Sequence, residues 1–259
     1  LVAIIDNQDP ATARPVGPID EFYTDPHAGI AVRPGAPVPV AELTQVPPVP
    51  RTARIFCIGL NYPLHIQETS KDRPAHPNIF GRWASKLSVD GASVPVPPGE
   101  TGLDCEAELA VVIGSEMSAV TDEEAMAGVF GYTGFNDISA RTYQNATSQF
   151  TLGKNADHSA PIGPVIVTAD ELGDPYSLRI RSRLNGETMQ DSVTANMIFN
   201  IAETISYISG VLTLRPGDVI ATGTPDGVGA WREPPVLMVA GDVIEVEIER
   251  IGILTSTIS

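Results

Sequence analysis

The fold is decided by the stretch Asp104-Cys105-Glu106-Ala107-Glu108-Leu109-Ala110-Val111-Val112-Ile113-Gly114. Its continuous apolar run is typical of a β-strand. Successive side chains of a strand point to opposite faces, so Glu106 and Glu108 are expected on the same face. Two carboxylates at that spacing repel each other and resist ionisation unless a cation lies between them. The stretch therefore predicts a strand that carries part of a metal site.

The ligand types indicate which cation this site would bind. Carboxylate oxygens with no nearby histidine or thiolate suit a hard ion such as Mg²⁺, Mn²⁺ or Ca²⁺. The best candidate for a third ligand is Asp137, where an apolar segment beginning at Gly131 ends in a polar turn. An alternative is an exposed strand with two glutamates on its solvent-facing side, because this alternation is common on half-buried strands. The pattern alone leaves both interpretations open.

A second polar pair follows an earlier apolar strand, residues 54–60. Pro63 can open a helix at its first turn, which would place His65 and Glu68 three residues apart on one face. A carboxylate beside an imidazole fixes the tautomer of the ring, as a general base that acts through water requires. The alternative is a solvent-exposed helix with an incidental polar pair.

Composition and charge limit the classes of function. The chain of 259 residues is long enough for one large domain, or for one domain and a small appendage. Its net charge of -16 repels nucleic acid and anionic membranes, so neither is expected as a partner. No apolar run approaches the roughly 20 residues that a membrane helix needs.

The two cysteines and the first residues bear on the compartment. Cys57 and Cys105 lie in apolar, strand-like runs, where buried free thiols are the usual finding. The segment that begins at Leu1 shows no signal or transit peptide pattern. These features predict a reducing, cytoplasmic setting.

Proline content divides the chain into two parts. Residues 1–50 are rich in proline, which lacks a backbone donor, and are expected to form a small, loosely organised N-terminal section. Residues 51–259 are expected to form the main domain. Strands are predicted in its second half, at residues 165–167, 178–184, 218–222 and 242–248. Asn185-Gly186 predicts a hairpin turn, and helices are predicted at 121–130 and 197–209.

Other nucleotide and hydrolase signatures are absent. Lys154 follows a glycine, but Ser148 and Asn155 stand where a phosphate-binding loop needs Gly and Ser or Thr. No G-x-G-x-x-G follows a strand, and no G-x-S-x-G elbow occurs. The glycine-rich loop 222–229 could present backbone donors to an oxyanion, or could be an ordinary tight turn.

Taken in order, these motifs resemble the fumarylacetoacetate hydrolase superfamily over about residues 51–259. The matching motifs are Gly59-Leu60-Asn61-Tyr62 with His65 and Glu68, the stretch 104–114, Asn136-Asp137-Ile138-Ser139-Ala140-Arg141, Gly153-Lys154, Asn185-Gly186-Glu187, Pro216-Gly217-Asp218 and Thr222-Gly223-Thr224-Pro225. The resemblance implies an α+β, predominantly β fold with a mixed β-roll or β-sandwich core and a few short helices. It also implies a homodimer.

The resemblance implies roles for individual residues. A divalent metal, Mg²⁺ or Mn²⁺ with Ca²⁺ as a substitute in crystals, would be held by Glu106, Glu108 and Asp137. His65 and Glu68 would activate a water or move a proton, and Lys154 would polarise a carbonyl. The residues expected to contact the substrate are Arg82, Arg141, Gln144 and Thr224.

Members of this family act on small 2-oxo or 1,3-dicarbonyl acids through a metal-stabilised enolate. Hydrolytic C–C bond cleavage is the preferred reaction; hydration, isomerisation, oxaloacetate-type decarboxylation and a specialised cyclase-like activity are alternatives. A non-catalytic binding protein is disfavoured because the whole residue set is intact. The chain departs from many relatives at Arg82, at Thr142 and at Ala156-Asp157-His158, which leaves the usual substrate in doubt.

Overall fold

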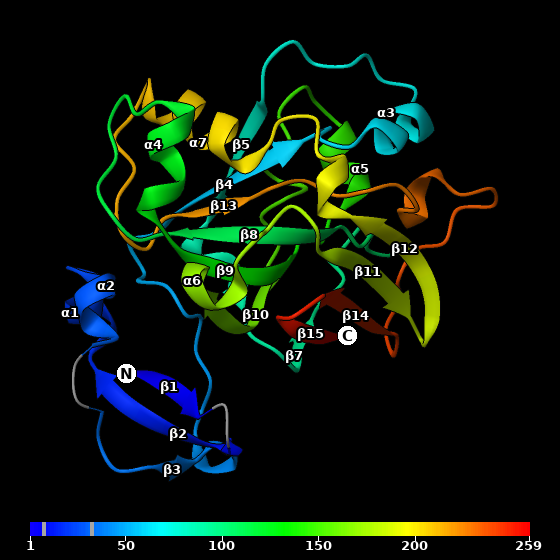
Figure 1. Cartoon of the computed structure of the whole chain (residues 1–259). Helices are drawn as coiled ribbons and strands as arrows, with labels where there is room; N and C mark the ends of the chain where they lie inside the picture. The colour runs from blue at the N-terminus through cyan, green and yellow to red at the C-terminus, as the bar shows by residue number, and fades with distance from the viewer. Residues whose placement is uncertain (7–8, 32–33) are drawn as a thin grey trace.

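The computed structural model describes residues 1–6, 9–31 and 34–259. Within these residues the strands form a three-stranded, a seven-stranded and a five-stranded sheet, and the helices are few and short (Figure 1). The fold is therefore α+β and predominantly β, as the family resemblance implies. None of the described helices is long and apolar enough to cross a membrane.

Neighbouring strands are consecutive in the small sheet, whereas the two larger sheets bring together strands from distant parts of the chain. The small sheet contains β1 (Val2–Asp6), β2 (Asp9–Gly17) and β3 (Val38–Pro39). The large sheet contains, in spatial order, β5 (Asn78–Trp83), β4 (Arg54–Gly59), β13 (Val219–Ala221), β8 (Ala107–Ile113), β9 (Val129–Asn136), β10 (Ala160–Thr168) and β6 (Leu87–Ser88). The third sheet contains, also in spatial order, β12 (Glu187–Val193), β11 (Arg179–Leu184), β14 (Val243–Ile248), β15 (Gly252–Ile258) and β7 (Ala92–Val94).

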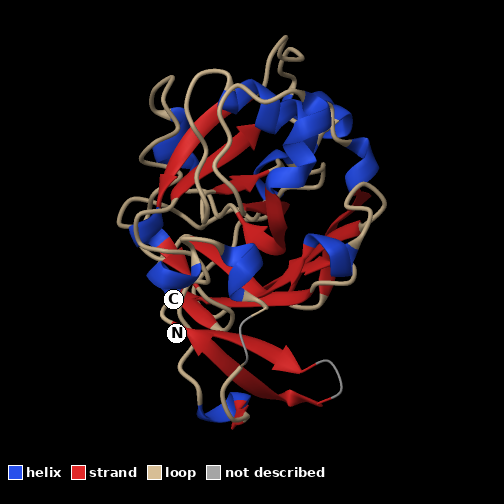
Figure 2. Cartoon of the chain, turned by 60° about the vertical axis from the view of Figure 1, so that its left-hand side comes forward, coloured by secondary structure: helices blue, strands red, loops and turns tan. Residues whose placement is uncertain are grey.

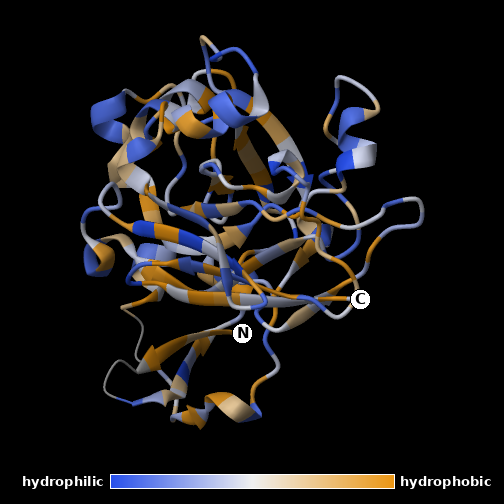
Figure 3. Ribbon diagram, turned by 90° about the vertical axis from the view of Figure 1, so that its right-hand side faces the viewer, coloured by the Kyte–Doolittle hydropathy of each residue, from blue (hydrophilic) through white to orange (hydrophobic). Residues whose placement is uncertain are grey.

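The helices lie mainly around the sheets (Figure 2). They are α1 (Ile19–Phe22), α2 (Pro26–Gly29), α3 (Pro63–Thr69), α4 (Asp122–Ala125), α5 (Arg141–Asn145), α6 (Ala169–Leu172) and α7 (Ile201–Ser209). Figure 3 shows hydrophobic residues along many interior strands and hydrophilic ones on several outer helices.

Strand β8 lies in the middle of the large sheet and is buried along its whole length. It pairs with β13 on one edge and β9 on the other, so its backbone polar groups are satisfied without solvent. Leu109 and Val111 face a core shared with the five-stranded sheet and α7, whereas Ala110 and Val112 face a second core. Burial on both faces explains why the sequence shows a continuous apolar run rather than alternation.

The N-terminal section is more ordered than the sequence predicts. Strand β2 pairs with β1 although it contains Pro10 and Pro15. Only Thr12 and Ala13 pair with β3, so neither proline is needed as a donor on that edge. The expectation of a loosely organised section is therefore wrong for the described residues among 1–50, which contain a small antiparallel sheet. Figures 1 and 2 show this sheet at one end of the molecule.

One local prediction is confirmed and another is corrected. Asn185 and Gly186 have φ values of 50° and 84° and join β11 to β12, which is the left-handed geometry of a tight hairpin turn. Thr121 caps α4 in a capping box with Glu124. The predicted helix 121–130 is too long, because α4 ends at Ala125, a short 3₁₀ turn follows and β9 begins at Val129.

Candidate active site

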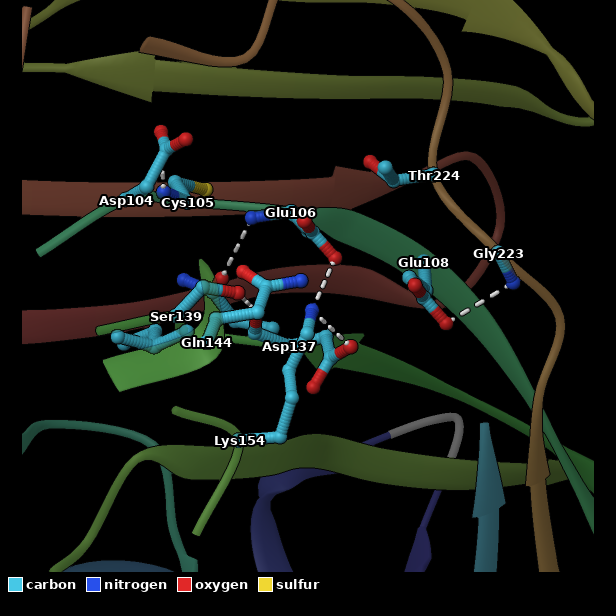
Figure 4. A network of polar contacts seen from close by, with 12 residues as sticks. Asp104, Cys105, Glu106, Glu108, Asp137, Ser139, Gln144, Lys154, Gly223 and Thr224 are labelled. Atoms are coloured by element: carbon cyan, nitrogen blue, oxygen red, sulfur yellow. Dashed lines mark hydrogen bonds and ion pairs between the residues drawn. The ribbon is translucent and has the colours of Figure 1, made fainter. Parts of the chain in front are cut away.

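Three carboxylates meet at one end of β8 and β9. Glu106 precedes β8, Glu108 lies within it, and Asp137 follows β9, the antiparallel neighbour of β8. One oxygen from each carboxylate lies within 4.8 Å of the others. All three residues are buried, with exposures of 6%, 2% and 0%. The alternative of a solvent-facing strand is therefore wrong for Glu106 and Glu108. Figure 4 shows both side chains together with Asp137.

The electrostatics of this group indicate a site for a cation. Burial raises the pKa of Glu108 well above its usual value, and the neighbouring Asp137 and Glu106 add to this rise. Burial alone would also raise the pKa of Glu106, but Lys154 and Arg141 together outweigh it and hold that pKa well below its usual range. A buried, all-carboxylate donor set of this kind fits a hard divalent cation.

Lys154 lies directly against two of these carboxylates. Its Nζ donates to Glu106 Oε2 and to Asp137 Oδ2, each at 2.6 Å (Figure 4). Burial would lower the pKa of Lys154, but Asp137 and Glu106 outweigh that effect and raise it, so the lysine is an ammonium ion. Asn155 holds the loop that carries Lys154 in place. Its side chain accepts from the Trp83 N–H at 2.7 Å and donates to the Thr151 carbonyl at 2.8 Å.

His65 and Glu68 lie on one face of α3, as the helical spacing predicts. His65 Nδ1 and Glu68 Oε1 are 2.7 Å apart, and Glu68 Oε2 accepts from the Gly227 N–H at 2.9 Å. A carboxylate next to Nδ1 favours the proton on that nitrogen, which leaves Nε2 to accept one. His65 is only 6% exposed, so the interpretation as a solvated polar pair is not supported.

Arg141 and Gln144 lie on α5, which begins directly after the Asp137 turn. Arg141 binds Asp104 through Nε at 2.9 Å and Nη2 at 2.7 Å, and Nη2 also lies 2.7 Å from Glu106 Oε1. Its Nη1 donates to Gln144 Oε1 at 2.7 Å. The carbonyl end of the Gln144 amide is therefore engaged, which leaves its NH₂ group as the donor toward a ligand.

Asp104 is an organising residue that the sequence did not reveal. Besides Arg141, it accepts from the backbone N–H groups of Gly229 at 2.7 Å and Ala230 at 3.1 Å. It is 1% exposed. Its position next to the predicted strand was visible, but these backbone partners are more than a hundred residues away in sequence.

Arg82 occupies a different place from the one expected for a substrate contact. It is 3% exposed, binds Asp137 through Nη1 and donates to the Ser159 carbonyl at 2.7 Å through Nη2. Among the described residues, it is not part of the pocket lining. Arg82 therefore contacts Asp137, a candidate metal ligand, instead of lining the pocket.

The glycine-rich loop 222–229 also differs from its predicted use. The Gly223 N–H donates to Glu108 Oε2 at 2.9 Å, and the N–H groups of Gly227 and Gly229 donate to Glu68 and Asp104. These N–H groups therefore bind and orient carboxylates of the protein, so they are not free to bind an oxyanion. The expectation that they are free for a ligand is wrong at these three positions.

A pocket with a volume of about 100 Å³ opens onto these groups. That is well below the roughly 300 to 1,000 Å³ of typical ligand pockets, so a small molecule is indicated. Its polar lining includes the predicted site residues His65, Glu106, Glu108, Arg141, Gln144, Lys154 and Thr224. Apolar lining that the sequence did not predict comes from Phe80, Phe150 and Trp231.

Known proteins resemble both the sequence and the fold. Residues 54–259 match the family model described as fumarylacetoacetate (FAA) hydrolase C-terminal. The chain is 41% identical over 223 residues to a mitochondrial oxaloacetate tautomerase of Bos taurus, which covers 85% of this chain and 71% of that protein.

Two solved structures extend the comparison. A 2-hydroxyhepta-2,4-diene-1,7-dioate isomerase from Mycobacterium marinum is 32% identical with a TM-score of 0.81, covering 99% of this chain and 91% of that one. A fumarylpyruvate hydrolase from Pseudomonas aeruginosa, in complex with Mn²⁺ and pyruvate, is 30% identical with a TM-score of 0.73, covering 84% and 92%.

Proposed function

Because the chain belongs to the fumarylacetoacetate hydrolase family of enzymes, we propose that it forms the enolate of a small 2-oxo acid in a metal-dependent reaction. We propose enol–keto tautomerisation of a 2-oxo dicarboxylate such as oxaloacetate as the main reaction. The observation that best supports this proposal is the cluster of Glu106, Glu108 and Asp137 next to the Lys154 ammonium, at a pocket of about 100 Å³. The similarity to an oxaloacetate tautomerase supports this choice.

Glu106, Glu108 and Asp137 are the residues that would hold the cation. A bound Mg²⁺ or Mn²⁺ would act as a Lewis acid that stabilises negative charge on the 2-oxo oxygen. Lys154 supplies a second positive charge, since its Nζ lies 2.6 Å from carboxylates of the same ligand set. A fixed ammonium near the developing enolate oxygen lowers the energy of the enolate without reorganisation.

His65 is the proposed acid–base group. Conversion of an enol to its keto form removes a proton from the oxygen at C2 and adds one at C3. Glu68 holds Nδ1 of the imidazole at 2.7 Å, so Nε2 is the atom that would take or deliver the proton. Glu68 is itself held by the Gly227 N–H, which fixes the orientation of the ring.

The remaining pocket donors suit an anionic substrate. Arg141, Gln144 and Thr224 line the pocket and each carries N–H or O–H groups. These residues are proposed to bind the carboxylate groups of the substrate. Arg82 is proposed to act on the substrate only through Asp137, because its guanidinium lies behind that residue.

Hydrolytic cleavage of a C–C bond is the second candidate. The His65–Glu68 pair is arranged as a general base for a water molecule, and the fumarylpyruvate hydrolase of similar fold supports this reaction.

We also propose a homodimer, from the family resemblance, and a small oxo acid rather than nucleic acid as the partner, from the net charge of -16. The cytoplasmic setting stays a prediction; the Bos taurus relative is named mitochondrial.

A spectrophotometric screen with Mg²⁺ or Mn²⁺ tests the proposal. The substrates are enol oxaloacetate, acylpyruvates and fumarylpyruvate-type acids. A tautomerase removes the enol absorbance without release of pyruvate or CO₂, whereas a hydrolase releases two acids. Asp137→Asn should abolish either activity, and Asp157→Asn, on an exposed carboxylate paired with Lys86, should leave it unchanged. No metal-dependent turnover of any of these acids would refute the proposal.

A further inference from the structure

We propose that Gln190 is a positioning residue that makes the Thr224 hydroxyl a hydrogen-bond donor toward a carboxylate of the substrate. The inference rests on the proposed function, because it assigns an anionic group of a 2-oxo acid to Thr224. Thr224 lines the pocket and is 3% exposed. Gln190 lies on β12 of the five-stranded sheet, is 1% exposed and is not among the described pocket-lining residues.

The Gln190 amide uses its full hydrogen-bonding capacity. Its Oε1 accepts from the Ala107 N–H at 3.0 Å and from Ser182 Oγ at 2.9 Å. Its Nε2 donates to Thr224 Oγ1 at 2.7 Å and to the Pro225 carbonyl at 2.8 Å. An amide side chain has two donors and two acceptor lone pairs, and all four are engaged in Gln190.

Two backbone groups fix the direction of this amide. The Ala107 N–H can only donate, and the Pro225 carbonyl can only accept. A flipped amide would bring its NH₂ group against the Ala107 N–H and its oxygen against the Pro225 oxygen. Both contacts are repulsive and buried, so the NH₂ group of Gln190 must face Thr224.

The Thr224 hydroxyl must therefore accept from Gln190. A hydroxyl has one proton besides its two lone pairs, and no acceptor among the described residues takes the proton of Thr224. That proton is available to a ligand in the pocket. The pocket thus offers a hydrogen-bond donor to an acceptor such as a carboxylate at this position.

The arrangement places Thr224 on the opposite side of Glu106 from Lys154 in the view of Figure 4. Lys154 contacts Glu106 and Asp137, whereas Thr224 contacts Gln190. Gln190 connects the five-stranded sheet to the pocket, because two of its other partners, Ala107 and Ser182, lie on β8 and β11.

Gln190→Glu tests the inference with little change in shape. It keeps an oxygen for Ala107 and Ser182 but replaces the NH₂ group by an oxygen, which would accept the Thr224 proton and would also remove the hydrogen bond to the Pro225 carbonyl. The KM for oxaloacetate should rise about 10- to 100-fold, the range for loss of one hydrogen bond to a charged group, while kcat changes little. Thr224→Val should raise KM similarly, and Thr224→Ser should retain the wild-type value.

A double variant separates positioning from a general structural effect. Gln190→Glu combined with Thr224→Val should raise KM no more than Thr224→Val alone, because the shared proton is already absent. Gln45→Glu is the matched control. Gln45 Nε2 also donates to a proline carbonyl, that of Pro164 at 2.9 Å, but Gln45 is exposed and is not among the pocket-lining residues. It should leave KM unchanged.

The outcomes distinguish this inference from the proposed function. An unchanged KM in Gln190→Glu, or additive losses in the double variant, would overturn the role of Gln190 while oxo-acid turnover by the wild type stands. A wild-type protein without oxo-acid turnover would overturn both. If Gln190→Glu does not fold, as judged by thermal melting and by Mn²⁺-induced stabilisation, Thr224→Val decides, and an unchanged KM there overturns the inference.

Discussion

Buried charge at the level of single residues explains why this pocket suits a cation and an anionic ligand together. Four buried carboxylates, Asp104, Glu106, Glu108 and Asp137, face two buried cations, Arg82 and Lys154, and the partly buried Arg141. Unpaired buried charge is costly, and Glu108 is the carboxylate of this group without a basic partner among the described residues. A divalent cation beside Glu108 would balance it and leave positive charge for an oxo acid.

Glu108→Gln tests this charge balance. Burial and the neighbouring Asp137 and Glu106 raise the folded-state pKa of Glu108, so its contribution to stability is present below its unfolded pKa and is lost as pH rises through the folded pKa. The metal-free variant should therefore melt higher than the metal-free wild type at pH 8, and the difference should shrink toward pH 4. Its Mn²⁺ affinity should fall about 100-fold or more. Thermal melts with EDTA and with Mn²⁺ measure both effects, and an unchanged Mn²⁺-induced stabilisation would exclude Glu108 as a ligand.

His65→Ala tests the acid–base assignment. Loss of a general acid–base group should lower kcat about 10²- to 10⁴-fold, while Mn²⁺ affinity barely changes. Glu68→Gln should cost less, because an amide still accepts from His65 Nδ1. His76→Ala is the control, since this exposed ring stacks on Tyr207 outside the pocket. Wild-type kcat in His65→Ala would show that the pair is incidental.

At the level of elements, local patterns in the sequence predicted local structure. The apolar run predicted β8, the spacing after Pro63 predicted the contact between His65 and Glu68, and Asn185-Gly186 predicted its hairpin. These features depend on residues close together in the chain. The organising roles of Asp104 and Gln190 could not be predicted, because they arise where strands and loops of different sheets meet.

Gly153→Ala tests how closely α5 packs against the lysine loop. A Cβ atom at Gly153 would lie 2.4 Å from both Cβ and N of Gln144, so the loop that carries Lys154 must move. The variant should lose about 1 to 3 kcal/mol of stability, and its activity should fall at least tenfold.

Gly17→Ala provides the control for this change, because a Cβ atom there meets nothing within 4 Å. Denaturant unfolding and the oxo-acid assay should separate the two variants clearly. Equal stability and activity in Gly153→Ala and Gly17→Ala would show that the lysine loop tolerates displacement.

For the whole molecule, the N-terminal section and the main sheet share a hydrophobic core. Phe22 lies 5.6 Å from Phe130 between ring centroids, and both rings belong to the same buried cluster as Val112. The sequence suggested a boundary near residue 50 from its prolines, and that boundary stays a prediction. Sequence composition could not reveal this packing, because it joins aromatic residues about a hundred positions apart.

Phe22→Ala tests whether this shared core makes the molecule unfold as one unit. Removal of a ring that is 7% exposed should cost about 3 to 5 kcal/mol, and unfolding should stay a single transition monitored by fluorescence and by circular dichroism. Leu43→Ala, at a side chain that is 43% exposed in the same section, should cost little. Mn²⁺ affinity should be unchanged, because Phe130 lies near the start of β9 and Asp137 follows its end, and each of the eight strand residues adds roughly 3.3 Å of length. Two separate unfolding transitions in the wild type, of which Phe22→Ala abolishes only the first, would give the opposite result. They would show that the N-terminal section unfolds independently of the sheet that carries the site.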